Sequence, residues 1–374
     1  MKSKLISTLV ITLALGTLVN KSLTVEAIAS EQAATTVING LNGPMGVLVT
    51  ANGHVWVIDT GVGGDEKVML PHALTGQMVG YGTGDSAQII RLDSAGGQTK
   101  IASLPSWYFE PGIGNAGGAR LAVLDGTVYA TVGGFSEDLL PSMASVVRID
   151  DGRAVQLASA GEFESATNSD GLTLESNPYA LSVGPDGKLW MIDAAGNTLV
   201  RVDPRSGQME LVAVFDGVAS PIPHPTRGGV METDPVPTGV AFDDDGNAYV
   251  SLLPGIPLAP GSAKVVRVDA NGDVSDYATG LTMLTDIRRG PDGFFYVVSF
   301  GEFTEQGPVQ DSGAILRVRE GAASEQVVGK LSFPTSIDFS AAGDAYVTIN
   351  GIGPPGTGKV VMYKGLASGS RSEP

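Results

Sequence analysis

Short apolar runs separated by turn residues recur along most of the chain. The clearest example is Asn177–Phe215, where four runs rich in Val, Ile, Leu and aromatic residues are bounded by Gly, Pro, Asp or Asn. This pattern is typical of β-strands rather than helices. Pro185-Asp186-Gly187 combines a fixed φ, a side chain that bonds its own backbone and a residue that tolerates positive φ, so it predicts a tight hairpin. Four such strands form a small sheet that needs neighbours on both faces.

The same unit recurs about six times. Each copy has a strand, a turn that usually contains Gly, a strand that contains Trp or Tyr, and a third strand. Four-stranded sheets repeated at this spacing predict an all-β protein, a six-bladed β-propeller. The aromatic markers are Trp56, Tyr129, Trp190, Tyr249, Tyr296 and Tyr346.

The sixth copy lacks a fourth strand of its own, because only a polar segment follows Lys364. A spare strand-like segment, Thr35–Leu41, precedes the first copy. We predict that it pairs beside Val360–Tyr363 and closes the ring, which leaves no exposed sheet edge. The expected organisation is a signal peptide at 1–29, a single propeller domain at 30–366 and a disordered tail at 367–374.

The first residues have the features of an export signal. Lys2 and Lys4 precede a mostly apolar stretch, Leu5–Val19, and Ala27-Ile28-Ala29 fits a cleavage site. A membrane anchor is the alternative, but the stretch is short for a span of about 20 residues. We therefore expect bacterial export to the periplasm or the medium, with no membrane association after cleavage.

The amino-acid composition excludes some kinds of chemistry and some classes of partner. The chain has no cysteine, which excludes disulfides and thiol nucleophiles. Its formal charge is −17 and its pI is about 4.5, which argues against nucleic-acid partners and anionic membrane surfaces. We expect a monomer.

The connections between predicted strands are unequal. Links from the first to the second strand and from the third to the fourth are short, whereas several other links are long, such as Thr60–Ala87, Ser106–Gly118 and Asp216–Pro237. In a propeller these two sets open on opposite faces, called here the short-turn face and the loop-rich face. Long ordered loops are usually functional or mobile, so we expect the site on the loop-rich face, at the mouth of the central channel.

Inner strands begin at this mouth, and polar or aromatic residues at their starts are the candidate ligand-binding residues. Carboxylate and amide oxygens around a channel are suitable ligands for calcium, and Asn177, Asp193 and Asp286 are the candidate ligands. The alternative is a rim hydrated by water, with Asp and Asn serving as turn caps. The candidates for binding a small molecule or protein partner are Trp107, Asn115, Asn177, Tyr179, Thr238, Asp286 and Thr335.

Trp107, Tyr108 and Phe109 form an aromatic cluster in a predicted linker. They either line a pocket for a flat apolar ligand or cap the core beneath a long loop. The sequence does not decide between these roles.

Two motif-like segments do not predict a site. Asp243–Asn247 resembles a calcium loop but lacks the acidic residue that closes it, and it lies where other copies have a hairpin. Gly112–Gly117 matches a dinucleotide fingerprint by letters only, since no helix follows it.

The three histidines and the recurring arginines are weak signals. His72 and His224 lie in long loops, where a general base or metal ligand competes with a solvated loop residue, and His54 is beside a short turn. An arginine recurs in the third strand, and we expect it to pair with neighbouring carboxylates. These arginines are Arg91, Arg148, Arg201, Arg267 and Arg317.

The repeats resemble the NHL-repeat, SMP-30/gluconolactonase and strictosidine-synthase-like propellers. Ser176–Leu181, Pro237–Phe242, Asn247–Ser251 and the loop Leu253–Pro260 more closely resemble the ScyD/ScyE family. That resemblance covers most of the chain and implies an exported six-bladed propeller associated with scytonemin-type pigment assembly. The lactonase relatives use Glu, Asn and Asp as metal ligands, and only Asn177 loosely corresponds.

Two functional hypotheses remain. The first is a binding or accessory propeller with its ligand or partner at the channel mouth. The second is a calcium-dependent lactonase-like hydrolase or lyase. Whether the protein is an enzyme is not decided by the sequence.

Overall fold

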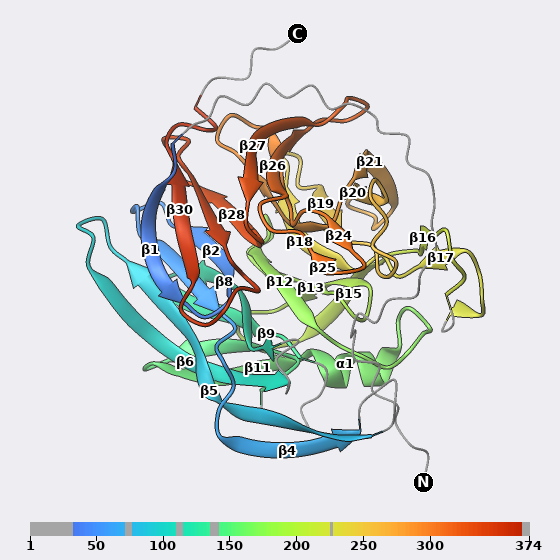
Figure 1. The fold of residues 1–374 in the computed structure, drawn as a ribbon, viewed down its shortest axis with the longest axis horizontal. Helices are drawn as coiled ribbons and strands as arrows, with labels where there is room; N and C mark the ends of the chain where they lie inside the picture. Colours follow the sequence, from blue (N-terminus) through green and yellow to red (C-terminus); the bar gives the residue numbers. More distant parts are fainter. Residues whose placement is uncertain (1–32, 72–76, 110–114, 135–141, 225–226, 369–374) are drawn as a thin grey trace.

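The computed structural model describes residues 33–71, 77–109, 115–134, 142–224 and 227–368. The predicted signal peptide, His72 and most of the predicted tail lie outside these residues. The described chain forms six antiparallel four-stranded blades arranged around a common axis, and a parallel contact between Ser103 and Arg153 joins blades 1 and 2 into one sheet (Figure 1). The predicted six-bladed β-propeller is confirmed.

In the first three blades, consecutive strands run from the axis outwards. Blade 1 contains β2 (Pro44–Val49), β3 (Val55–Asp59), β5 (Met78–Leu92) and β6 (Gln98–Phe109). Blade 2 contains β8 (Gly118–Leu124), β9 (Thr127–Val132), β10 (Ser145–Asp150) and β11 (Arg153–Ser159). Blade 3 contains β12 (Pro178–Val183), β13 (Leu189–Asp193), β14 (Thr198–Val202) and β15 (Met209–Val214).

The next two blades repeat this order, and the sixth closes the ring. Blade 4 contains β18 (Pro237–Phe242), β19 (Ala248–Leu252), β20 (Ala263–Val268) and β21 (Val274–Leu281). Blade 5 contains β22 (Leu284–Arg289), β23 (Phe295–Ser299), β26 (Gly313–Val318) and β27 (Glu325–Leu331). Blade 6 contains β28 (Ser336–Phe339), β29 (Ala345–Ile349), β30 (Gly358–Tyr363) and, as its outer strand, β1 (Thr35–Leu41).

Closure of the ring follows the prediction. β1 pairs antiparallel with β30, with Thr35 opposite Met362 and Leu41 opposite Gly358. The inner strands β2, β8, β12, β18, β22 and β28 contact one another in turn, and β28 contacts β2. The first and last strands therefore belong to one blade (Figure 1).

Three of the six marker aromatics are anchored by the hairpin turns that precede them. Trp190 Nε1 donates to Asp186 Oδ1 at 2.9 Å, and Tyr296 Oη donates to Asp292 Oδ2 at 2.7 Å. Tyr249 Oη makes the same contact with Asp243 Oδ2 at 3.1 Å. The ring is buried between blades while its polar tip bonds to the turn, which explains why turn Asp and aromatic recur together. Asp243–Asn247 is thus a hairpin turn, as predicted.

All additional elements lie in the long connections. The segment 60–87, expected as a loop, instead contains β4 (Glu66–Pro71), which pairs with the first half of β5 and projects from blade 1 (Figure 1). The helix α1 (Ala160–Thr167) was not predicted. It begins at the N-cap Ser159, whose Oγ accepts from Glu162 N at 2.9 Å. The others are β7 (Asn115–Ala116), β16 (Val218–Ala219), β17 (Glu232–Thr233), β24 (Phe303–Thr304) and β25 (Gly307–Pro308).

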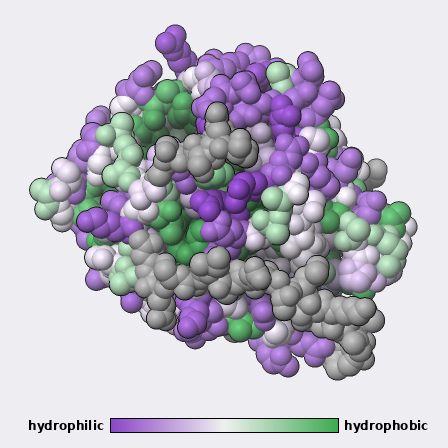
Figure 2. Space-filling model, turned by 90° about the horizontal axis from the view of Figure 1, so that it is seen from above, coloured by the Kyte–Doolittle hydropathy of each residue, from purple (hydrophilic) through white to green (hydrophobic). Residues whose placement is uncertain are grey.

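Hydrophobic side chains fill the spaces between neighbouring blades. On the side shown in Figure 2, the hydrophobic residues at the surface form separate groups among hydrophilic ones. Within the described ranges, no helix has the length and hydrophobicity needed to cross a bilayer.

Candidate functional site

Arg120 of β8 occupies the axis of the ring. Its guanidinium donates to the carbonyl oxygens of Thr285 at 2.7 Å, of Thr335 at 2.8 Å and of Met45. It also lies 4.7 Å from the centroid of the Tyr179 ring. Met45, Tyr179 and Thr285 belong to the inner strands of blades 1, 3 and 5, and Thr335 directly precedes that of blade 6. One side chain from blade 2 therefore links five blades.

Asp286 of β22 provides the opposite charge. Its Oδ2 lies 3.7 Å from Arg120 Nε, and both side chains are 1% exposed. The carboxylate also accepts from Ser336 Oγ at 2.6 Å and from Ile337 N at 3.2 Å. Ser336 Oγ in turn accepts from Val47 N at 3.2 Å. The buried pair is therefore embedded in a network that reaches blades 1 and 6.

This network lies at the axis, between the inner strands. It brings together three of the predicted site residues, Tyr179, Asp286 and Thr335, around an arginine that the sequence analysis did not single out. Thr335 Oγ1 donates to Pro44 O at 2.6 Å, which ties blade 6 to blade 1. Burial raises the pKa of the Tyr179 phenol. The chemistry visible here is hydrogen bonding between blades, with the guanidinium as its centre.

Other predicted site residues also bond within the protein. Thr238 Oγ1 donates to Leu284 O at 2.8 Å, which joins blades 4 and 5. Asn115 Nδ2 donates to Thr60 Oγ1 at 2.7 Å, and Asn177 Oδ1 accepts from Gly134 N at 3.2 Å. Both asparagines thus connect long segments of the loop-rich face.

The three candidate metal ligands are not gathered as one donor set. Asp193 accepts from Ser176 Oγ at 2.5 Å and from the backbone N–H groups of Asn177 and Gly196, at 2.7 and 3.0 Å, whereas Asp286 belongs to the Arg120 network. Burial raises the pKa of Asp193. Among the described residues, no three His, Cys, Asp or Glu side chains come close enough to hold a metal ion. The calcium site remains a prediction without a matching cluster.

Two further acids are buried on the loop-rich side. Asp59 accepts from Gln88 N at 2.9 Å and from Asn42 N at 3.2 Å, and burial raises its pKa to about 6. Glu164 of α1 is 3% exposed, and burial, with the charges of Asp170 and Asp193, raises its pKa to about 8. Glu164 was missed because the helix that carries it was not predicted.

The described histidines occupy different faces. His224 Nε2 lies 3.6 Å from Asp234 Oδ2, in the long connection between blades 3 and 4. His54 lines a cavity on the short-turn face. No observation assigns catalysis to either.

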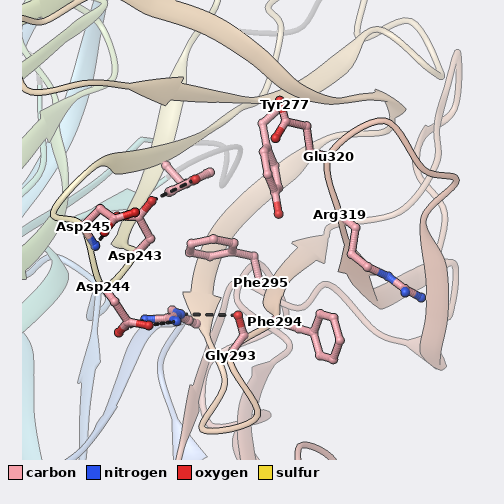
Figure 3. Close-up of a pocket in the computed structure, with 11 residues that line it drawn as sticks. Asp243, Asp244, Asp245, Tyr277, Gly293, Phe294, Phe295, Arg319 and Glu320 are labelled. Atoms are coloured by element: carbon pink, nitrogen blue, oxygen red, sulfur yellow. Dashed lines mark hydrogen bonds and ion pairs between the residues drawn. The ribbon is translucent and has the colours of Figure 1, made fainter. Parts of the chain in front are cut away.

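Both cavities described here open on the short-turn face, away from the predicted site. One, of about 440 Å³, lies between blades 4 and 5 (Figure 3). Tyr277 and Phe295 stand between its acidic turn, Asp243–Asp245, and Arg319. Its arginine on β22, Arg289, is already paired by two 2.6 Å bonds to Asp244. The other, of about 750 Å³, lies near the axis.

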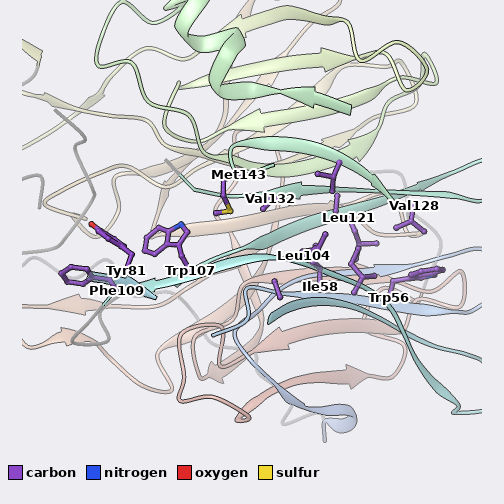
Figure 4. Close-up of a cluster of buried hydrophobic side chains, with 14 residues drawn as sticks. Trp56, Ile58, Tyr81, Leu104, Trp107, Phe109, Leu121, Val128, Val132 and Met143 are labelled. Carbon is purple, nitrogen blue, oxygen red and sulfur yellow. The ribbon is translucent and has the colours of Figure 1, made fainter. Parts of the chain in front are cut away.

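The aromatic cluster lies in a strand and not in a linker, because β6 continues to Phe109. Trp107 is 4% exposed and packs edge-on against Tyr81 at 5.3 Å between ring centroids. Trp107, Tyr81 and Phe109 form one end of a buried cluster that extends to Trp56 (Figure 4). Of the two roles left open, this geometry matches capping of the core.

Exposed apolar side chains are concentrated in the long connections. Among the described residues, eleven large hydrophobic side chains are exposed, and only Val155, Leu211 and Val274 lie on blade strands away from these connections. The other eight belong to links that open on the loop-rich face. They are Val62, Met69, Met78, Leu174, Ile222, Val230, Met231 and Ile352.

Similarity to known proteins lies in the fold. No protein-family model matches the chain, and no curated protein matches it in sequence. A gluconolactonase from Xanthomonas campestris superposes over 91% of this chain and 93% of its own, with a TM-score of 0.53 and 13% identity. The PQQ-bound aldose sugar dehydrogenase from Streptomyces coelicolor covers 90% of this chain and 99% of its own, with a TM-score of 0.51 and 16% identity. At these identities the likeness shows a shared β-propeller fold alone, and the ScyD/ScyE resemblance stays a prediction.

Proposed function

We propose that this protein is an exported binding or accessory propeller, whose loop-rich face docks a partner protein through apolar contacts. The observation that carries the proposal is the placement of eight of the eleven exposed large hydrophobic side chains in connections on that face. Exposed apolar groups gathered on one face mark interaction sites more often than scattered ones do.

The arrangement at the axis supports docking over chemistry inside the channel. Arg120 lies 3.7 Å from Asp286 and donates to the surrounding carbonyl groups, so these polar groups at the axis join blades. A partner would contact the long connections on the loop-rich face. The apolar residues come from the connections of blades 1, 2, 3 and 6, a spread that suits an extended surface better than one small molecule.

The ScyD/ScyE resemblance suggests where the protein acts and in which kind of pathway. It supports an accessory role outside the cytoplasm in the assembly of a scytonemin-like secondary metabolite. No observation of the described residues favours the calcium-dependent lactonase alternative, because Asp193 and Asp286 each have partners within the protein.

Site-specific photo-crosslinking in the exporting host tests the proposal. A photoreactive amino acid replaces Met231 or Met69 on the loop-rich face, and Leu211 on the outer strand β15 is the matched exposed control. We expect one discrete protein adduct from both loop positions and none from Leu211. A small-molecule adduct alone, or the same adducts from all three positions, would refute protein docking at this face.

A further inference from the structure

The cavity of about 750 Å³ on the short-turn face is a separate feature of the molecule. Its walls come from the inner strands β2, β8, β12 and β22, together with the 50–54 turn and β5 of blade 1. Because these inner strands surround the axis, the cavity lies at the short-turn mouth of the channel.

The charged groups that line this cavity are all basic. Arg91, Arg288 and, when protonated, His54 carry positive charge, and none of the described residues that line the cavity has a carboxylate. This is unusual in a chain whose formal charge is −17. A concave basic site in an acidic protein attracts anions, since field lines focus in a concave region with apolar walls.

Arg91 lacks the opposing glutamate that the third-strand arginines of blades 3 and 5 have. In blades 3 and 5 the residue opposite the third-strand arginine is glutamate: Glu210 faces Arg201, and Glu325 faces Arg317, and both pairs form ion pairs. In blade 1 the residue opposite Arg91 is Thr99. Arg91 instead lies over the Trp56 ring at 5.5 Å.

Arg288 is also weakly bound. Among the described residues, its guanidinium makes one long hydrogen bond, from Nη1 to Val240 O at 3.5 Å, and its Nε has no hydrogen-bond partner. Asp338 is the acidic group whose charge acts on it, but Asp338 Oδ2 accepts from Val49 N at 2.7 Å. Within the described ranges, no carboxylate oxygen lies within 4 Å of a nitrogen atom of Arg288 or Arg91.

The remaining wall is largely apolar. Leu48, Leu121 and Leu181 project from three different inner strands, with Trp56 on the side of Arg91. Cavities of about 300–1,000 Å³ with apolar walls and a few convergent polar groups are typical of small-molecule sites. Guanidinium groups bind carboxylates through paired, charge-assisted hydrogen bonds.

We propose that this cavity binds an organic carboxylate with an apolar, ring-sized body. The carboxylate pairs with Arg91 and Arg288, and the body packs on the leucine wall and Trp56. The site is independent of the partner docking proposed for the opposite face, so each proposal can fail without the other.

Isothermal titration calorimetry with 2-naphthoate tests this site, and 2-naphthylmethanol serves as the neutral probe of similar shape. We expect saturable binding of the anion and an affinity for the alcohol at least about tenfold lower, a difference of about 1.4 kcal/mol. Arg91→Gln and Arg288→Gln should each weaken 2-naphthoate binding by about tenfold, the loss of one charge-assisted contact.

Two further variants keep the test decisive. Arg267→Gln removes the third-strand arginine of blade 4, which does not line the cavity, and should leave the affinity unchanged. Ser182→Phe should block binding by filling the cavity without removing a charge, even if Arg288→Gln fails to fold. Absence of saturable binding by the wild type, equal affinity for the two probes, or equal losses in the Arg267 variant would overturn the proposal.

Discussion

The buried Arg120 should be the most sensitive single position in the ring. Replacing it by methionine keeps much of the side-chain volume but removes the donor for the Met45, Thr285 and Thr335 carbonyls. It also leaves Asp286, 1% exposed, without the positive charge 3.7 Å away. The variant therefore loses the hydrogen bonds that join the blades and also leaves a buried negative charge without its partner.

The size of the effect follows from burial. A buried acceptor left without a donor costs about 1–3 kcal/mol, and breaking a buried ion pair from one side costs about 3–5 kcal/mol. These contributions overlap because one side chain makes all the contacts. We expect Arg120→Met to lower the free energy of unfolding by about 4 kcal/mol or more, a value at the upper end of single substitutions.

Guanidinium denaturation followed by tryptophan fluorescence measures this loss. Arg148→Met is the matched control, since Arg148 forms its 2.6 Å ion pair with Asp150 while both side chains are more than one third exposed, and surface pairs contribute little. Arg120→Met/Asp286→Asn should be more stable than Arg120→Met alone, because it removes the stranded charge. Equal midpoints for Arg120→Met and Arg148→Met would show that the axial network does not hold the blades together.

Three other outcomes follow from the structure. Ile38→Glu on β1 should lower the melting temperature sharply, because Ile38 is buried. Asn39→Glu, at an exposed position on the same strand, should leave it unchanged. Similar melting curves for the two variants would contradict closure of the ring by this strand. Burial raises the pKa of Glu164 to about 8, so the native state binds this proton more tightly than the unfolded state, and stability falls as pH rises from about 4.5 to about 8. Glu164→Gln should flatten that dependence, and Glu162→Gln on the exposed side of α1 should preserve it; an identical slope in all three proteins would contradict the buried assignment. Millimolar calcium, followed by EDTA, should leave the melting temperature unchanged, and a rise that EDTA reverses would restore the metal-site prediction.

Strands, turns and closure were predictable because their signals are local. The turn Pro185-Asp186-Gly187 and the apolar runs on either side of it predict a hairpin, and repetition of this pattern identifies the blades. The hairpin of β4 and β5 was missed because Gly80, Gly82 and Gly84 interrupt the apolar alternation. A side chain at Gly82 would collide with the Tyr108 ring, which its Cβ would approach to 2.2 Å.

The arrangement at the axis was not predictable in the same way. Arg120 stands alone in the run Gly118–Leu124, and its partners Thr285 and Thr335 lie 165 and 215 positions away in sequence. Nothing local distinguishes an arginine that points to the axis from one that faces solvent. The predicted residues Tyr179, Asp286 and Thr335 were found through their position at strand starts, but the cation that unites them was not.

The pairing of β1 with β30 also sets an order for biosynthesis. The segment Thr35–Leu41 is synthesised before blades 1 to 5, whereas its partner Gly358–Tyr363 is synthesised after them. Blades 1 to 5 are each contiguous in sequence, so they can form in turn, but the ring stays an open arc until the final strand is available. A nascent chain that stops before Gly358 keeps an unsatisfied β1, which makes truncated products a direct target for aggregation or for proteases.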